Sequence, residues 1–305
     1  MFRQLIAAGG LFLAANAQAV EVPGPLATPE WLSQHRTDVA VIDVRGKPAT
    51  FAKQGHIPGA ALADWGNIRT EGEENGVTLR KMLPDATTFR ELMRGWGVDQ
   101  GEAVVITTPG NTPGHVAHAA RLYWQVKYYG HDNVTLLDGG NAAWTEAGHK
   151  LARGEADVTR GDFRIEDKRR EYLATTADVE RIVAEGGPQL VDNRPLPYYL
   201  GLAQKSYVKA PGHIPGAKLM PFPYVASGDK ALKMRSTEEL RSYAKAMGID
   251  PDQPVVTYCN SGNVNTVGWF VFHELLNTPE VRAYDGSMHA WTKDPERPTT
   301  TMQME

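Results

Sequence analysis

HIPGA at residues 56–60 returns letter for letter at residues 213–217, and the organisation of the whole chain follows from this repeat. Three further stretches recur in the same order: Asp43-Val44-Arg45 with Asp192-Asn193-Arg194, residues 104–107 with 255–258, and Asp138-Gly139-Gly140 with Asp285-Gly286-Ser287. Matches that keep their order indicate two copies of one structural unit. The separation between the copies is largest at HIPGA, because the second copy has a longer loop between Arg194 and His213.

Each copy alternates strand-like apolar runs with amphipathic helical segments. The first copy predicts strands at 39–44, 104–107 and 134–138, and helices at 87–97 and 116–129. The second copy predicts strands at 189–192, 254–258 and 281–285, and helices at 176–185, 237–247 (with Ser236 as its N-cap) and 264–276. Such alternation predicts an α/β fold, with a mostly parallel sheet covered by helices in each copy.

The composition is that of an ordinary globular protein. The 305 residues suffice for two domains, and 42% are hydrophobic while 22% are charged. The net charge of -4 supplies no electrostatic reason to expect nucleic acid or an anionic membrane surface as a partner.

The N-terminus has the pattern of a secretory signal peptide. A cationic start is followed by a short apolar run and by the small residues Ala17-Gln18-Ala19, which predicts cleavage after Ala19. We therefore expect an exported protein, periplasmic in a cell with two membranes, with no membrane attachment after cleavage. An uncleaved anchor or a buried N-terminal helix is the alternative. The predicted parts are a signal peptide at 1–19, a first domain at 20–152, a polar linker at 153–172 and a second domain at 173–305.

Cys259 is the lone cysteine of the chain, and it directly follows the predicted strand 254–258. Parallel α/β sheets bind ligands beyond the carboxyl ends of their strands. A short loop between a strand and a helix directs its backbone N–H groups inward, which favours an anion at the cysteine sulfur. The residues expected to surround the sulfur in this way, as a cradle for a persulfide, are Asn260, Ser261, Gly262, Asn263 and Val264. Gly262 permits a positive φ there. A buried, inert thiol is the alternative.

These motifs together resemble the tandem rhodanese-type sulfurtransferases, which include thiosulfate and 3-mercaptopyruvate sulfurtransferases. The resemblance rests on both HIPGA motifs, both Asp-x-Arg motifs, the Cys-x-x-Gly loop and Tyr284-Asp285-Gly286-Ser287 with Trp291. It implies two five-stranded parallel sheets and a catalytic second domain. There Cys259 takes a sulfane sulfur from a small-molecule donor and passes it, as a persulfide, to a thiophilic acceptor such as cyanide or a thiol. The first domain, with Thr108 at the aligned position, is implied to be inactive.

The sequence departs from well-known members of that family in its charges. Asn260 and Ser261 stand where thiosulfate-type loops carry cations, and Tyr198 stands where many members carry a substrate-binding arginine. The candidate substrate-binding residues are Arg194, Tyr198, Lys205 and Arg235, and Lys209 and Lys233 are further candidate cations. Each lysine is also an ordinary surface residue by pattern, and Arg194 with Asp192 also fits a structural ion pair.

Other histidines and tryptophans have simpler interpretations. His56 and His213 lie in both HIPGA copies, which favours a turn or packing role, and Trp144 and Trp291 match each other, which favours core packing. His115 and His118 share a helix face, but no third ligand is near, so we expect no metal and no cofactor.

Two other functions remain open at this point. A phosphatase or arsenate reductase needs an arginine that closes the cysteine loop, and residues 264–266 read Val-Asn-Thr. A non-catalytic sulfur carrier or protein-binding module is the alternative that the missing loop cations favour.

Overall fold

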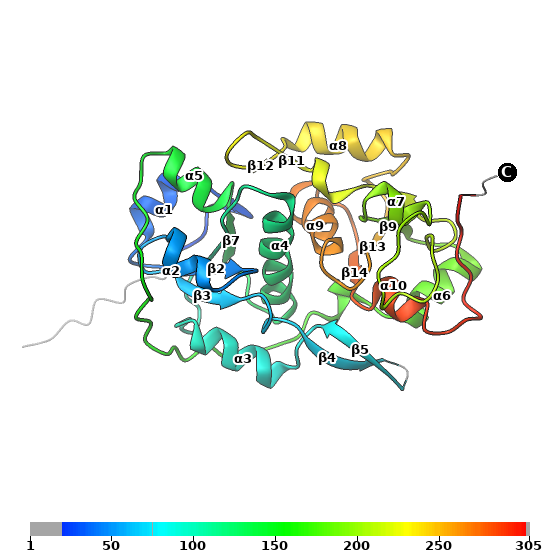
Figure 1. Ribbon diagram of the computed structural model, residues 1–305, viewed down its shortest axis with the longest axis horizontal. Helices are drawn as coiled ribbons and strands as arrows, with labels where there is room; N and C mark the ends of the chain where they lie inside the picture. Colours follow the sequence, from blue (N-terminus) through cyan, green and yellow to red (C-terminus); the bar gives the residue numbers. More distant parts are fainter. Residues whose placement is uncertain (1–19, 75, 303–305) are drawn as a thin grey trace, which may run out of the picture.

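Two similar α/β units lie side by side in the computed structural model, which describes residues 20–74 and 76–302 (Figure 1). Each unit holds a five-stranded, all-parallel sheet, in the order β1-β7-β6-β2-β3 and β10-β9-β13-β14-β8. The predicted tandem α/β fold is therefore confirmed. The predicted signal peptide at 1–19 lies outside the described residues and stays a prediction.

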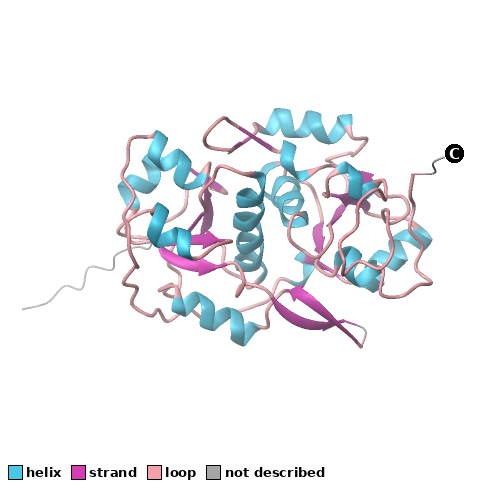
Figure 2. Cartoon of the chain, in the orientation of Figure 1, coloured by secondary structure: helices cyan, strands magenta, loops and turns pink. Residues whose placement is uncertain are grey.

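The strands of the first sheet are short and mostly apolar: β1 (Leu26–Ala27), β2 (Ala40–Arg45), β3 (Ala61–Asp64), β6 (Val104–Thr107) and β7 (Val134–Leu137). Those of the second are β8 (Leu173–Ala174), β9 (Gln189–Asp192), β10 (Lys218–Leu219), β13 (Val255–Tyr258) and β14 (Val281–Tyr284). The central strands β6 and β13 are fully buried, because helices cover both faces of each sheet (Figure 2). All six strands predicted from the sequence are present, with their ends shifted by at most one residue.

The helices of the first unit are α1 (Pro29–His35), α2 (Ala49–Gln54), α3 (Ala86–Gly95), α4 (Pro113–Tyr128) and α5 (Gly140–Glu146). Those of the second unit are α6 (Thr176–Glu185), α7 (Leu196–Tyr199), α8 (Thr237–Ala246), α9 (Asn265–Phe270) and α10 (Ser287–Trp291), with short turns of other helix types at 170–172, 222–224 and 271–275. Helix α4 begins before the predicted Val116, because the Thr112 side chain caps it and Pro113 suits its first turn. Ser236 caps α8 as predicted, in a reciprocal pair with Glu239.

Two hairpins that the sequence analysis did not predict cross between the units. The first is β4 (Thr70–Glu74) with β5 (Val77–Met82), cyan in Figure 1, and it reaches toward the second unit. The second is β11 (Ala226–Ser227) with β12 (Lys233–Met234), yellow in Figure 1, and it reaches over the first unit. The β4–β5 hairpin follows the edge strand β3, and the β11–β12 hairpin follows the matching edge strand β10. Each unit therefore extends the same kind of hairpin toward the other unit.

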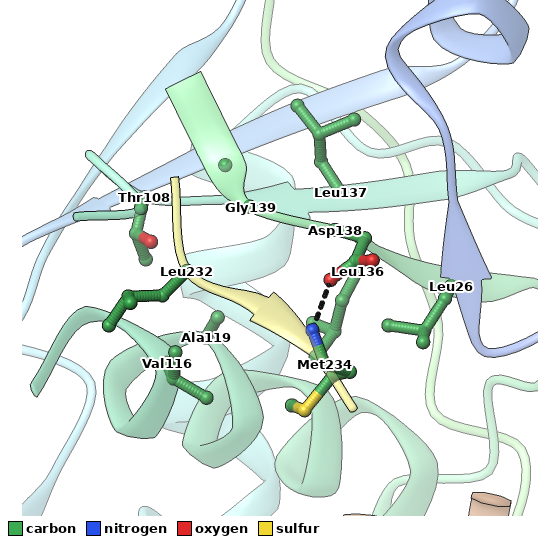
Figure 3. Close-up of a pocket in the computed structure, with 12 residues that line it drawn as sticks. Leu26, Thr108, Val116, Ala119, Leu136, Leu137, Asp138, Gly139, Leu232 and Met234 are labelled. Carbon is green, nitrogen blue, oxygen red and sulfur yellow. Dashed lines mark hydrogen bonds between the residues drawn. The ribbon is translucent and has the colours of Figure 1, made fainter. Parts of the chain in front are cut away.

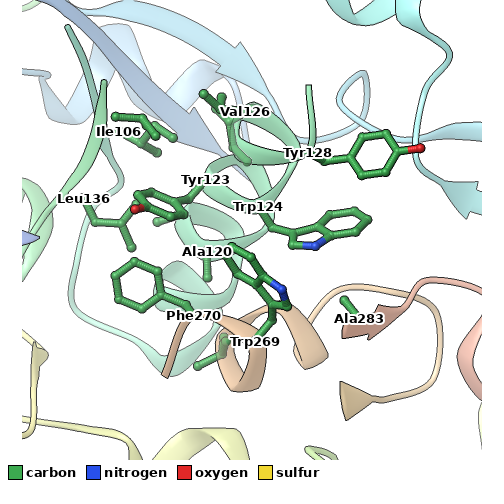
Figure 4. Packing of buried hydrophobic residues seen from close by; sticks show 14 of the residues in the cluster. Ile106, Ala120, Tyr123, Trp124, Val126, Tyr128, Leu136, Trp269, Phe270 and Ala283 are labelled. Atoms are coloured by element: carbon green, nitrogen blue, oxygen red, sulfur yellow. The ribbon is translucent and has the colours of Figure 1, made fainter. Parts of the chain in front are cut away.

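One hydrophobic cluster runs through both units and joins them. Ala120, Tyr123 and Trp124 of α4 face Trp269 and Phe270 of α9 (Figure 4). The rings of Tyr123 and Phe270 meet edge to face, with 4.9 Å between their centroids. A buried aromatic interface of this kind holds two domains in one orientation. The cleft between the units therefore has a defined shape.

The polar linker follows the surface of the first unit in an extended course and is attached to it by one buried side chain. Phe163 is 1% exposed, and its carbonyl accepts a hydrogen bond from Arg94 Nε at 2.8 Å. Its amide donates to the Val98 carbonyl at 3.1 Å. The linker is thus packed against α3 rather than free. Within the described part of the chain, no helix combines the length and apolar character that crossing a membrane requires.

Candidate active site

Cys259 lies at the carboxyl end of β13, the middle strand of the second sheet, and the loop 259–264 leads directly into α9. The side chain is 2% exposed. Its Sγ accepts a hydrogen bond from the Asn263 amide at 3.3 Å, and its thiol is 3.5 Å from Asn265 Oδ1. The sulfur therefore has one backbone donor available to an anion, and one side-chain acceptor available to a thiol.

Ser287 shapes the loop in a way that the sequence analysis did not anticipate. Its hydroxyl accepts from the amides of Cys259, at 3.0 Å, and of Gly262, at 3.4 Å, and donates to the Tyr284 carbonyl at 2.7 Å. The expected cradle is therefore only partly formed around the sulfur: the Asn263 amide points at Sγ, whereas these two point at Ser287. Gly262 has φ +67°, as predicted.

The other loop residues hold neighbours rather than the sulfur. The Asn260 side chain accepts from Arg194 Nη1 at 3.3 Å. The Ser261 hydroxyl lies 3.2 Å from the hydroxyl of Tyr207. Val264 contributes an apolar surface to the cavity described next.

A cavity of about 410 Å³ opens in front of Cys259 at the junction of the two units. It is lined by Arg69, Lys81, Arg194, Pro195, Tyr198, Lys205, Tyr207, Phe222, Cys259, Asn260, Ser261, Asn263 and Val264. A cysteine that borders such a cavity at the end of a central strand is positioned to react with a small molecule. This geometry argues against the inert, buried thiol.

Two cations of this cavity come from the first unit and were not among the predicted residues. Arg69 stacks on Trp65, with its guanidinium carbon 4.1 Å from the ring centroid, and its Nη1 is 3.5 Å from the Ser261 carbonyl oxygen. Burial, and secondarily the nearby Arg121, lowers the pKa of Arg69 to about 10, so it remains a cation at neutral pH. Lys81 Nζ lies 4.4 Å from the Tyr207 ring centroid, and burial lowers the pKa of this lysine.

Three of the four predicted substrate-binding residues line the cavity, and one does not. Tyr198 and Lys205 do, with Lys205 Nζ 5.5 Å from the Tyr198 ring centroid. Arg194 does too, but Asp192 holds its guanidinium at 2.6 Å and the Gly212 carbonyl accepts from it at 2.8 Å. Arg235 is not among the residues that line this cavity. Its Nε donates to the Tyr224 carbonyl at 2.8 Å and its Nη1 pairs with Glu239 at 3.1 Å.

The matching position in the first unit is closed. Thr108 follows β6 as Cys259 follows β13, but the cavity beside it measures only about 30 Å³. Leu232 and Met234 of the β11–β12 hairpin fill the space in front of it (Figure 3). The Met234 amide donates to Asp138 Oδ1 at 2.8 Å, and the Leu232 amide donates to the Gly110 carbonyl at 2.8 Å. The β11–β12 hairpin of the second unit thus fills the position in the first unit that corresponds to the cavity in front of Cys259.

The first unit contacts the loop of Cys259 in return. The amide of Leu83, just after β5, donates to Asp285 Oδ2 at 2.7 Å, as Met234 does to the matching Asp138. Arg121 of α4 is fully buried, and its Nη1 donates to Asp285 Oδ1 and to the carbonyl of Gly262. A cation from the first unit therefore holds the cysteine loop from behind.

Comparison with known proteins identifies the architecture. The sequence profile described as "Rhodanese-like domain" matches residues 28–147 and again residues 175–294. The chain belongs to the rhodanese family. It is similar to "Sulfur carrier protein TtuD" of Thermus thermophilus, with 32% identity over 88% of this chain and 94% of that protein. "Probable 3-mercaptopyruvate sulfurtransferase" of Pseudomonas aeruginosa is 33% identical over 87% of this chain and 93% of that protein.

Solved structures agree with this placement. SseA from Escherichia coli, described as a 3-mercaptopyruvate sulfotransferase, superposes with a TM-score of 0.72 at 26% identity, over 87% of this chain and 98% of that chain. A complex of EanB with ergothioneine gives a TM-score of 0.79 at 22% identity, over 92% of this chain and 71% of that chain, and shows the shared fold. With its sulfurtransferase relatives, this rhodanese is an enzyme of the sulfurtransferase class.

The repeated motifs of the two rhodanese domains have structural roles. Arg45 pairs with Asp43 at 2.6 Å, as Arg194 pairs with Asp192. His56 stacks on Phe51 and His213 stacks on Tyr199, each with ring centroids 3.7 Å apart. Trp144 and Trp291 are 3% and 1% exposed. The expected packing roles of these residues are confirmed.

His118 stacks on Trp65 with ring centroids 3.9 Å apart, and burial lowers its pKa to about 4. Within 20–74 and 76–302, the structure contains no group of three or more side chains suited to hold a metal.

Proposed function

We propose that this enzyme transfers a sulfane sulfur from a donor of the thiosulfate or 3-mercaptopyruvate class to a thiophilic acceptor such as cyanide or a thiol. The Cys259 thiolate attacks the sulfane sulfur, and the bond between that sulfur and the rest of the donor breaks. The acceptor then attacks the outer sulfur of the Cys259 persulfide, which restores the thiolate. Sulfur is carried through both steps without a net redox change.

The observation that carries this proposal is the position of Cys259. Its sulfur borders the cavity of about 410 Å³ and receives the Asn263 amide at 3.3 Å. A backbone donor at this position stabilises negative charge on a thiolate and on the persulfide that replaces it. Thr108, the matching residue of the first domain, has neither a thiol nor an open cavity.

Intact mass spectrometry before and after addition of a donor tests the persulfide. We expect wild-type protein to gain the mass of one sulfur atom, to lose it on addition of cyanide, and to release thiocyanate. Cys259→Ala serves as the control and should gain nothing. If wild-type protein gains no sulfur from thiosulfate, 3-mercaptopyruvate or an organic thiosulfonate, the proposed chemistry is wrong.

A second candidate function is that of a sulfur carrier without turnover, and the similarity to TtuD favours it. Both functions require the persulfide, so steady-state kinetics separates them. An enzyme produces many equivalents of thiocyanate for each equivalent of protein, whereas a carrier that is reloaded only by its own partner stops at one.

We also propose that the protein is exported, since residues 1–19 have the cationic, apolar and small-residue order of a signal peptide. Mass spectrometry of protein from the native cell should find an N-terminus at Val20. Recovery of the full-length chain from the cytoplasm would contradict export.

A further inference from the structure

The cavity in front of Cys259 is lined by both cationic and apolar side chains. Arg69, Lys81 and Lys205 supply positive charge, and among the described residues no aspartate or glutamate lines the cavity with them. Pro195, Phe222 and Val264 supply apolar surface. Cys259 lines the same cavity. A molecule bound there can therefore contact the cationic and the apolar side chains while its sulfur reaches the thiolate.

Arg69 is the central cation because the protein leaves part of it unpaired. Its Nε is buried and has no hydrogen-bond partner among the described residues, and its Nη1 has only the 3.5 Å contact with the Ser261 carbonyl. A buried guanidinium without a carboxylate partner keeps donor capacity for an anion. Its stacking on Trp65 orients the planar group.

The two lysines lie around the same space from opposite domains. Lys81 comes from β5 of the first domain and lines the same cavity as Arg69 and Lys205. Burial, and then these two cations, lowers the pKa of Lys81. Cations held close together without acids repel one another, and a bound anion removes this cost. Arg194 adds little, since Asp192 already neutralises it.

We propose that Arg69, Lys81 and Lys205 form a sulfonyl-binding subsite across the domain interface, and that the donor is an organic thiosulfonate whose organic group lies on Phe222 and Pro195. This inference rests on the proposed function and specifies its substrate class. The three cations take the place of the loop cations that Asn260 and Ser261 replace. The first domain, which lacks a nucleophile, thereby supplies two of the three charges.

The chemistry of the leaving group supports this class of donor. The Cys259 thiolate attacks the outer sulfur of R–SO₂–S⁻, the S–S bond breaks, and its electron pair leaves with the sulfinate R–SO₂⁻. The sulfinate stays an anion and needs compensating charge but no proton. The carbon fragment left by a 3-mercaptopyruvate donor needs a proton. Among the described residues that line the cavity, only tyrosine hydroxyls and lysine ammonium groups could supply it, and neither a carboxylic acid nor an imidazole is present.

The subsite can be tested on the charge alone, without sulfur transfer. Iodoacetate and iodoacetamide alkylate the same thiol but differ in charge, so the ratio of their rates at Cys259 measures the local positive potential. We expect Arg69→Met and Lys81→Met to lower the iodoacetate-to-iodoacetamide ratio by up to about tenfold. Arg80→Met is the matched control, because Arg80 adjoins Lys81 on β5 but its side chain is 78% exposed and pairs with Glu71.

The outcomes separate the subsite from the proposed function. An unchanged ratio in Lys81→Met and in a folded Arg69→Met would overturn the subsite, even if the persulfide forms normally. If Arg69→Met does not fold, Lys81→Met and the charge-preserving Arg69→Lys decide. Absence of sulfur gain from every donor, with the expected alkylation ratios, would instead remove the proposed function and leave an anion site.

Donor kinetics then tests the organic group. We expect a lower KM for benzenethiosulfonate than for thiosulfate, and a severalfold rise in the KM for benzenethiosulfonate alone in Phe222→Ala. Equal KM values for both donors in wild-type protein, or an equal effect of Phe222→Ala on both, would show that the apolar side chains do not contact the donor.

Discussion

Replacement of Gly262 by alanine tests whether contacts from the first domain hold the cysteine loop. Gly262 has φ +67°, and a Cβ added there would overlap the Asp285 carboxylate and lie 2.9 Å from Arg121 Nη1. Gly248 has φ +72° with nothing within 4 Å of such a Cβ. Gly262→Ala and Gly248→Ala therefore impose the same backbone strain, and only the first disturbs the ion pair.

The magnitudes follow from that comparison. A left-handed alanine costs about 1–2 kcal/mol, less about 0.4–1 kcal/mol for the reduced freedom of the unfolded chain, so Gly248→Ala should lower the free energy of unfolding by about 1 kcal/mol. Gly262→Ala must also displace Asp285 from Arg121, and breaking a buried ion pair costs about 3–5 kcal/mol. We expect Gly262→Ala to cost about 3 kcal/mol more than Gly248→Ala.

Urea denaturation of both variants measures this difference, and sulfur gain by mass spectrometry measures the effect on the site. Gly262→Ala should also lose most of its persulfide formation, because its loop carries the Asn263 amide that bonds Cys259 Sγ. Equal stabilities for the two variants, with full persulfide formation in Gly262→Ala, would refute the claim that this loop is held by the Arg121–Asp285 pair.

Three further outcomes follow from the structure. In Cys259→Ala, the added change Thr108→Cys should not restore sulfur gain from thiosulfate, since about 30 Å³ beside residue 108 leaves no room for a donor; a gain by mass spectrometry would contradict the closed counterpart site. Arg121→Met should lower the urea midpoint and kcat together, because Asp285 and the Gly262 carbonyl lose their hydrogen-bond donor. A lower urea midpoint with unchanged kcat would show that Arg121 stabilises the domain interface but does not position the loop of Cys259. The pKa of His118 in the folded protein is about 4, below its ordinary value of 6.5, so the unfolded chain binds more protons than the folded chain between these pH values, and the free energy of unfolding falls as pH drops from 6.5 to 4. His118→Gln should therefore flatten this part of a plot of urea midpoint against pH. An unchanged slope would show that another group causes the acid sensitivity.

The repeated motifs made the sheets predictable and indicated Cys259 as the candidate nucleophile. Strands such as Val104–Thr107 and Val255–Tyr258 are short, apolar and central, and their pattern alone identifies them. Cys259 follows from the rule that ligands bind at the carboxyl ends of parallel strands. The longer loop between Arg194 and His213 was also visible, and it supplies Lys205 to the cavity.

The missing parts depend on contacts between the two copies, which no local pattern contains. Arg69 and Lys81 lie far from Cys259 in sequence and belong to the first domain, so no sequence pattern connects them with the loop of Cys259. Arg235 is closer in sequence but does not line the cavity. The β4–β5 and β11–β12 hairpins are short and half polar. Their position is set by contacts with the opposite domain, so their local sequence does not predict them. Ser287 belongs to the repeated Asp-Gly motif, but its hydrogen bonds with two loop amides depend on tertiary packing.

The reciprocal hairpins give the chain the geometry of a two-fold symmetric dimer whose protomers have been joined into one polypeptide. Leu83 on Asp285 and Met234 on Asp138 are the same contact made twice, as an isologous interface requires. Such an interface needs both partners but only one reactive centre. The half without a thiol still supplies Arg69 and Lys81 to the cavity in front of Cys259, as one subunit of a dimer can supply residues to a site on its partner.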